Sequence, residues 1–241
     1  MGSSYFALHP ACIHLNERGV PAFMLETSEL LHYHRDLISG RTFVVLVSQS
    51  GETVEGVRLL DAIHGQAAVM SITNEEASSI ARRSDLSLPL LAGREEGPAS
   101  KSYTASLAVT LLWALTLTTG IDPQMVRGLR AAIDAMEGHL REWEEHTARL
   151  SAFLQDSERL ALLARGPSLA SAAAGALILK EVAKVQGEAM SAGQFRHGPL
   201  EIAGPGFAAV IFAMRGKTQE LNLRLAHDVA RFGGKAVVIG D

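Results

Sequence analysis

Short apolar runs alternate with longer amphipathic segments along most of this chain. Apolar positions three or four residues apart, such as Val54, Val57, Leu60 and Ile63, predict helices between the runs. Strands that alternate with helices are typical of an α/β fold with mostly parallel sheets. The runs rich in β-branched or small apolar side chains, which predict buried strands, are residues 42–47, 67–73, 86–91, 160–164, 208–213 and 235–239.

Two long helical segments suggest how the chain is divided. Residues 101–119 are nearly all apolar, which predicts a helix buried on most sides. Residues 122–157 are studded with charges and predict a helical connector. We therefore expect a first domain at residues 1–121 and a second at residues 158–241, joined by that connector.

The chain also repeats itself. The segment VVLVSQSGETVE recurs as VIFAMRGKTQE and aligns Gly51 with Gly216 and Thr53 with Thr218, an offset of 165 residues. Two similar α/β halves are the simplest interpretation. The second half has a strand, residues 160–164, before its Gly-Pro-Ser turn, whereas the chain starts at the matching turn of the first half. We expect both halves to be incomplete, the first without its opening strand and the second without its C-terminal part.

Composition narrows the class of protein. With 241 residues, 47% of them hydrophobic, the chain can bury a large core and does not resemble a disordered protein. A net charge of −4 argues against a nucleic-acid partner bound through a basic surface. The single cysteine, Cys12, fits a reducing compartment, and neither a signal peptide nor a membrane-spanning run occurs. We expect a cytoplasmic protein without a membrane partner.

The polar loop at residues 48–53 (SQSGET) carries the first candidate site. It follows a predicted parallel strand and opens a helix, at the edge of the sheet where α/β proteins bind ligands. The hydroxyls of Ser48, Ser50 and Thr53, with helix N-terminal amides, predict an anion site, naturally for a phosphate. Helix capping alone is the alternative, because Ser and Thr favour N-caps. Three hydroxyls and the close-approach residue Gly51 exceed what capping needs.

The first turn of the chain offers further hydroxyl donors for an anion. The sequence contains no motif for a nucleotide or a metal ion. Ser3 and Ser4 lie on the turn of the first half that matches the Gly-Pro-Ser turn of the second. Neither a P-loop nor a Gly-x-Gly-x-x-Gly sequence occurs, so a nucleotide cofactor is not indicated. His32 and His34 are two residues apart, which is not a helical metal pair. We expect no metal and no cofactor.

A second candidate site combines a carboxylate with a histidine. Glu181 lies in an otherwise apolar helical segment, where partial desolvation would raise its pKa and suit it to proton transfer at carbon. His197, in a turn held by Gly198 and Pro199, is a candidate second acid/base. The alternative makes Glu181 a solvated or ion-paired helix residue and His197 an ordinary turn residue. The residues alone leave both interpretations open.

Together these motifs resemble the sugar isomerase (SIS) family over essentially the whole chain. The resemblance rests on S-Q-S-G-E-T at residues 48–53, K-E at 180–181, H-G-P at 197–199 and the opening G-S-S-Y at 2–5. It is to the double-domain members, which include the isomerase half of glutamine–fructose-6-phosphate aminotransferase and stand-alone amino-sugar-phosphate deaminases and isomerases. The resemblance implies two flavodoxin-like halves, each a parallel sheet flanked by helices.

The resemblance also implies a substrate and a mechanism. The substrate would be a hexose 6-phosphate, above all an amino-sugar phosphate such as glucosamine 6-phosphate. Glu181 would move the proton between C1 and C2, and His197 would assist ring opening across a dimer interface, which implies a homodimer. The positions that would bind the substrate are Ser3, Ser4, Ser48, Gln49, Ser50, Thr53 and Ala99 or Ser100.

Three departures from the family pattern keep several functions open. Ala174 and Ile178 stand where the aminotransferase has a glutamate and a lysine. The segment at residues 97–101 (GPASK) resembles an A-S-T-K stretch of the family but is one residue shorter. Pro10 stands where relatives have a helix interior, so it should kink or shorten that helix. We favour an aldose–ketose isomerase or deaminase. The isomerase half of an aminotransferase is the alternative enzyme, and a non-catalytic sugar-phosphate-binding protein is the alternative outside enzymes. The intact Glu181 and His197 oppose the last.

Overall fold

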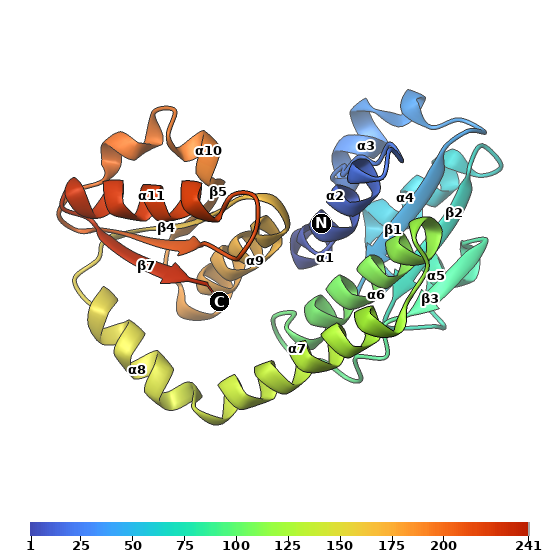
Figure 1. Ribbon diagram of the computed structural model, residues 1–241. Helices are drawn as coiled ribbons and strands as arrows, with labels where there is room; N and C mark the ends of the chain where they lie inside the picture. Colours follow the sequence, from blue (N-terminus) through green and yellow to red (C-terminus); the bar gives the residue numbers. More distant parts are fainter. Residues whose placement is uncertain (241) are drawn as a thin grey trace. The chain divides into compact units, whose positions relative to one another are not determined.

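The computed structural model describes residues 1–240, which form two compact units, the first ending at Ala114 and the second beginning at Leu115 (Figure 1). The first unit is built on a parallel sheet in the order β1-β2-β3, comprising β1 (Phe43–Ser48), β2 (Ala68–Thr73) and β3 (Leu86–Pro89). Its helices are α1 (Gly2–Phe6), α2 (His9–Glu17), α3 (Thr27–Tyr33), the 3-10 turn η1 (Arg35–Leu37), α4 (Val54–Ile63), α5 (Ser79–Arg83) and α6 (Lys101–Thr118).

Helices cover both faces of this sheet. On one face, apolar residues of α4, among them Leu59 and Ile63, pack against Val44 of β1. On the other, Trp113 of α6 packs against the cluster around Ile72 of β2. Because side chains alternate along a strand, each strand supplies both layers. The strands end in register, with Ser48 opposite Thr73 and Thr73 opposite Pro89, so the loops that follow them share one edge.

Helix α6 differs in part from its prediction. The residues that it buries are the small ones at every fourth position, Ser102, Ser106, Thr110 and Ala114, whereas Leu117 is 58% exposed. The Thr110 hydroxyl donates to the carbonyl oxygen of Ser106 at 2.6 Å, so its burial leaves no polar group unpaired. The face with small side chains is thus fully buried, and the face with Ala105, Val109 and Trp113 is half-buried against the sheet, so burial is widespread as predicted but complete on one face only.

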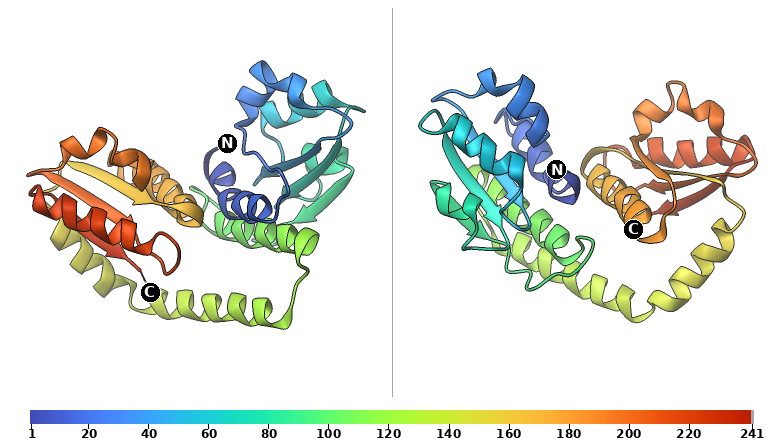
Figure 2. Two further views of the ribbon diagram at one scale, coloured as in Figure 1. Left: turned by 45° about the horizontal axis from the view of Figure 1, so that its top comes forward. Right: turned by 180° about the vertical axis from the view of Figure 1, so that it is seen from behind.

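The second unit is built on a four-stranded parallel sheet in the order β5-β4-β6-β7 (Figure 2). Helix α11 packs on one face, against Leu163 and Ile211, and helix α9 on the other, against Leu162 and Val210. The strands are β4 (Arg159–Ala164), β5 (Gly187–Ser191), β6 (Phe207–Phe212) and β7 (Lys235–Ile239). Its helices are α7 (Pro123–Arg141), α8 (Trp143–Leu154), η2 (Gly166–Ser168), α9 (Leu169–Ile178), the π turn η3 (Leu179–Ala183), α10 (Ala192–Phe195), η4 (Pro199–Ile202) and α11 (Gln219–Arg231).

The predicted α/β fold with two similar parallel-sheet halves is confirmed. The segment β1-α4-β2 recurs as β6-α11-β7 at the offset read from the sequence. All six predicted strands form, but β5 was not predicted, because Gly187 and Glu188 interrupt its apolar pattern. The predicted helical connector holds α7 and α8, in which no residue is buried.

Pro10 interrupts the first helix of the chain, as predicted. Helix α1 ends at Phe6, α2 begins at His9, and Pro10 occupies the first turn of α2. This is the helical position where the missing amide proton of proline leaves no hydrogen bond unmade. Across residues 1–240, no helix is long and apolar enough to cross a membrane.

Candidate functional site

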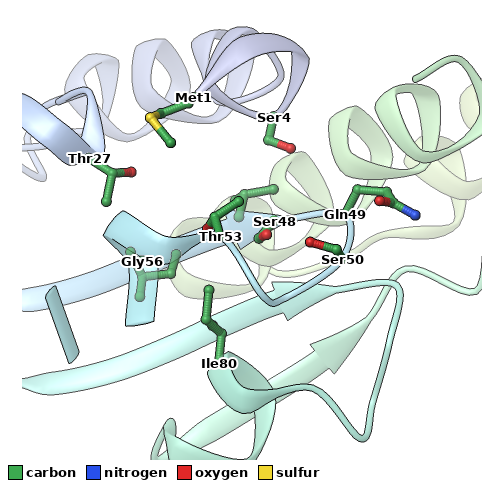
Figure 3. Close-up of a pocket in the computed structure, with 11 residues that line it drawn as sticks. Met1, Ser4, Thr27, Ser48, Gln49, Ser50, Thr53, Gly56 and Ile80 are labelled. Carbon is green, nitrogen blue, oxygen red and sulfur yellow. The ribbon is translucent and has the colours of Figure 1, made fainter. Parts of the chain in front are cut away.

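A pocket lies at the carboxyl end of β1, in the first unit (Figure 3). Five residues predicted to bind substrate line it together: Ser4 from α1, and Ser48, Gln49, Ser50 and Thr53 from the loop between β1 and α4. The sequence had not indicated the remaining lining residues, which are Met1, Thr27, Leu46, Val47, Gly56 and Ile80. Ser3 is a neighbour of Ser4 on α1 but does not line the pocket.

Two serine hydroxyls shape the loop and remain able to donate. The Ser48 hydroxyl oxygen accepts from the Gly51 amide at 3.1 Å, and that of Ser50 accepts from the Glu52 amide at 3.2 Å. A hydroxyl that accepts through its oxygen keeps its own proton for another partner. Both side chains therefore offer an O–H donor, which is what an anion in this pocket would need.

The geometry of Thr53 distinguishes between the two roles expected for the loop hydroxyls, ligand binding and helix capping. It is the N-cap residue of α4, with extended φ and ψ of −61° and 128°, yet its side chain makes no capping hydrogen bond. Thr53 lines the pocket together with Ser48 and Ser50 (Figure 3). The backbone amides of the first turn of α4 add further donors, because the first amides of a helix have no partner within it. Capping alone does not explain the threonine.

Ala99 and Ser100 are not brought into the pocket. The Glu95 carboxylate holds the start of α6 instead, since its Oε1 accepts from the Ser100 amide at 2.9 Å and the Lys101 amide at 2.8 Å. Burial opposes ionisation of Glu95, but hydrogen bonds from Ser102, Ser100 and Lys101 outweigh it and lower the pKa of Glu95. An acidic side chain of the chain itself thus occupies the amides at this helix start. Glu95 was missed because it precedes the helix by six residues, which is not a capping spacing.

Glu181 and His197 lie in the second unit, and both are exposed. Glu181 is on the π turn η3, beside Val182, which is 61% exposed, and Val185, which is 44% exposed. These two apolar neighbours therefore face solvent, whereas Leu179 packs against the core of the unit. Glu181 is thus not buried among apolar side chains as expected, because this segment lies at the surface of its unit.

The turn that carries His197 is firmly held. Its amide donates to the Gln194 carbonyl oxygen at 2.9 Å. On the N-terminal side, the buried Phe195 ring stacks on Phe207, and Arg196 pairs with Asp228 of α11 at 2.7 Å. Gly198 follows with a φ of 119°, which a side chain would disfavour. The backbone around His197 is thus fixed although its ring is exposed.

Relatives of this chain carry the name glutamine–fructose-6-phosphate aminotransferase (isomerizing). The chain is 31% identical over its whole length to the glutamine–fructose-6-phosphate aminotransferase (isomerizing) of Pyrococcus horikoshii, of which it covers 41%. It is 30% identical over 92% of its length to the same enzyme of Escherichia coli K12, of which it covers 38%. The chain thus spans about two fifths of the length of these relatives.

Solved structures share the fold over the whole chain. The C-terminal domain of the glucosamine–fructose-6-phosphate aminotransferase of Francisella tularensis matches with a TM-score of 0.89 and 26% identity, over 71% of that chain. The glucosamine-6-phosphate deaminase of Thermotoga maritima matches with a TM-score of 0.82 and 20% identity, over 74% of that chain. The family model for the SIS domain matches residues 1–116 and 153–241. The chain therefore belongs to the SIS domain family.

Proposed function

We propose that this protein binds a phosphosugar and acts as an aldose–ketose isomerase or deaminase on an amino-sugar phosphate such as glucosamine 6-phosphate. The observation that carries the proposal is the pocket at the carboxyl end of β1, where three hydroxyls and the start of α4 converge. Such a set of donors suits a dianionic phosphate. Membership in the SIS family supports a sugar as the rest of the ligand.

The proposed chemistry is a proton transfer between C1 and C2 after ring opening. Glu181 would take the proton from one carbon and return it to the other, and His197 would assist ring opening. Migration of the carbonyl alone gives an isomerase. On glucosamine 6-phosphate the same proton transfer leaves an imine at C2, and its hydrolysis by water to the ketone releases ammonia, which gives a deaminase. We further propose that the protein works as a homodimer, which sedimentation velocity tests directly; a monomer at all concentrations would contradict this part.

The isomerase half of a glutamine–fructose-6-phosphate aminotransferase is the second candidate. It is favoured by the relatives of that name, which match 92% or more of this chain. Ala174 and Ile178, which replace the glutamate and lysine of that motif, oppose it. Formation of glucosamine 6-phosphate from fructose 6-phosphate with glutamine as the nitrogen source, when a glutaminase domain is supplied, would favour this candidate, because a deaminase run backwards also uses free ammonia.

A non-catalytic sugar-phosphate-binding protein is the third candidate. It is favoured by the exposure of Glu181 and His197, since perturbed catalytic groups tend to lie in buried clefts. Incubation with glucosamine 6-phosphate separates the candidates, and we expect ammonia and fructose 6-phosphate to appear in equal amounts. Saturable binding without turnover would favour the binding protein over the enzyme. Absence of binding would contradict the proposal that the ligand is a phosphosugar.

Replacing Thr53 by valine tests the pocket without disturbing the loop. The Thr53 hydroxyl makes no capping bond, so Thr53→Val should leave folding unchanged while it removes one donor to the phosphate. A hydrogen bond to a charged group contributes about 1.5–3 kcal/mol, so affinity for fructose 6-phosphate should fall roughly 10- to 100-fold. Calorimetric titration measures the loss, and Ser50→Ala should weaken binding as well. Ser151→Ala, on the exposed surface of α8, is the control. Unchanged affinity in both pocket variants would contradict the phosphate assignment.

A further inference from the structure

Glu52 places a carboxylate in the middle of the proposed phosphate loop. Two negative charges at close range repel each other, so a glutamate at this position should oppose phosphate binding. The side chain does not line the pocket. Its Oε1 instead accepts a hydrogen bond from the Ser79 amide at 2.7 Å, at the start of α5. The carboxylate therefore has a partner elsewhere, which explains how the loop tolerates it.

The Ser79 contact is one of three tethers between two loops. The Gln49 carbonyl oxygen accepts from the Asn74 amide at 3.1 Å, and the Gly51 carbonyl oxygen accepts from the Ile80 amide at 3.0 Å. The partners of all three tethers lie within residues 74–80, the segment that follows β2. Two of the tethers use backbone atoms only, so Glu52 is the residue whose identity decides whether the third one forms.

The same contact favours the ionised form of Glu52. Hydrogen bonds from Ser79 are the largest influence on the carboxyl group and lower its pKa, and the positive charge of Arg82 acts in the same direction. An ionised acceptor forms a stronger hydrogen bond than a neutral one. The tether is therefore complete at neutral pH, where a phosphate monoester carries most of its charge.

The tethered residues flank the donors to the phosphate. The Glu52 amide donates to the Ser50 hydroxyl oxygen at 3.2 Å, and Thr53 follows directly. We propose that Glu52 is a positioning residue of the phosphate pocket: its bond to Ser79 holds the loop in the conformation that aims the Ser50 and Thr53 hydroxyls at the anion. This inference rests on the proposed function, since it assigns Glu52 a part in the same phosphate pocket.

A repulsive role and a positioning role of the Glu52 carboxylate predict opposite effects of Glu52→Ala on phosphate affinity. If the carboxylate acted only as a nearby charge, its removal would raise the affinity for phosphate. Because it positions the loop, we expect the affinity for inorganic phosphate and for fructose 6-phosphate to fall about three- to tenfold, the cost of ordering one or two side chains on binding. Glu52→Gln should bind close to normally, since the amide oxygen of glutamine can accept from Ser79. Glu76→Ala removes an exposed charge nearby and is the matched control.

Ser79→Pro removes the same hydrogen bond from the other side. Ser79 is the first residue of α5, where proline is well tolerated, and the preceding Ser78 is already extended, with φ of −70° and ψ of 161°. We expect Ser79→Pro to weaken phosphate binding as Glu52→Ala does. The double variant should be no weaker than either single one, because both changes remove one interaction.

Calorimetric titration of the full chain with inorganic phosphate, at one fixed salt concentration, decides the matter. Weaker binding in Glu52→Ala and Ser79→Pro, near-normal binding in Glu52→Gln and full non-additivity support the inference. Wild-type affinity in Glu52→Ala, additive losses, or equal losses in the alanine and glutamine variants would overturn it and leave the proposed function standing. A wild-type protein that binds neither inorganic phosphate nor fructose 6-phosphate would overturn both. If Glu52→Ala fails to fold, Glu52→Gln and Ser79→Pro still give the comparison.

Discussion

Gly51→Ala is expected to disrupt the pocket proposed to bind phosphate and to destabilise the first unit. Gly51 has a φ of 63°, and a Cβ added there would lie 2.0 Å from the Ser78 hydroxyl oxygen and 2.4 Å from its Cβ. The left-handed conformation costs an L-residue about 1–2 kcal/mol, and overpacking costs about 1–3 kcal/mol more. Together these predict a loss of about 2–5 kcal/mol in the free energy of unfolding.

We expect the pocket to lose affinity for its ligand because Ser78 cannot easily move away from the added methyl group. Ser78 is 4% exposed and its hydroxyl caps α5 by accepting from the Ala81 amide, so it cannot turn away without cost. The loop would have to move, and with it the Ser48 hydroxyl, which accepts from the Gly51 amide. Urea unfolding and calorimetric titration with fructose 6-phosphate measure the two effects.

Gly65→Ala is a matched control for this prediction. Gly65 has a similar φ of 70°, but no atom lies within 4 Å of the position that its Cβ would take. It should therefore show only the cost of the backbone conformation, about 1–2 kcal/mol, and normal ligand affinity. If Gly51→Ala bound fructose 6-phosphate as tightly as Gly65→Ala does, the close packing of the loop on Ser78 would have no role in the pocket.

Glu181→Gln is expected to abolish turnover and to preserve affinity. Glutamine has nearly the same shape as glutamate but cannot take the proton from carbon, and loss of a general base typically lowers kcat by about 10²–10⁴-fold. Folding should be unaffected, because Glu181 is exposed. The variant should bind glucosamine 6-phosphate with the wild-type dissociation constant while ammonia release and exchange of the transferred proton with solvent deuterium both stop.

Glu188→Gln provides the comparison for Glu181. Glu188 is an exposed glutamate on β5 of the same unit, and the substitution changes the charge by the same amount. Its turnover should equal that of the wild-type protein. Normal turnover in Glu181→Gln would remove this residue from the mechanism. A large loss of affinity would make Glu181 a binding group rather than a base.

Most of the fold could be predicted from local patterns in the sequence. The short apolar runs predicted all the strands except β5, and the polar loop at the end of β1 was placed correctly because the carboxyl ends of parallel strands share one edge. The break before Pro10 was also readable, since proline lacks the amide proton that a helix interior needs. These features depend on neighbouring residues and on spacing, which a single sequence contains.

The hydrogen-bond partners of the polar side chains could not be predicted from local patterns. Glu52 and Ser79 are 27 residues apart, and nothing in the spacing of Glu52 indicates that its carboxylate would leave the pocket. Glu95 likewise reaches across a loop to amides at the start of α6, where Ser100 had been expected to contact substrate. The exposure of Glu181 was misjudged because apolar neighbours in the sequence do not show whether their own faces are buried.

The amino-acid sequence by itself determined the class of fold, the repeat of two parallel-sheet halves and the position of the hydroxyl-rich loop, because periodicity and turn chemistry act over a few residues. Only the tertiary structure decided which of those polar groups converge on the pocket. Hydrogen bonds between loops depend on how strands order within a sheet, and β1 and β2 lie side by side here, bringing residues 49–52 against residues 74–80. That packing places Ser50 and Thr53 at the pocket and turns the Glu52 carboxylate toward the Ser79 amide.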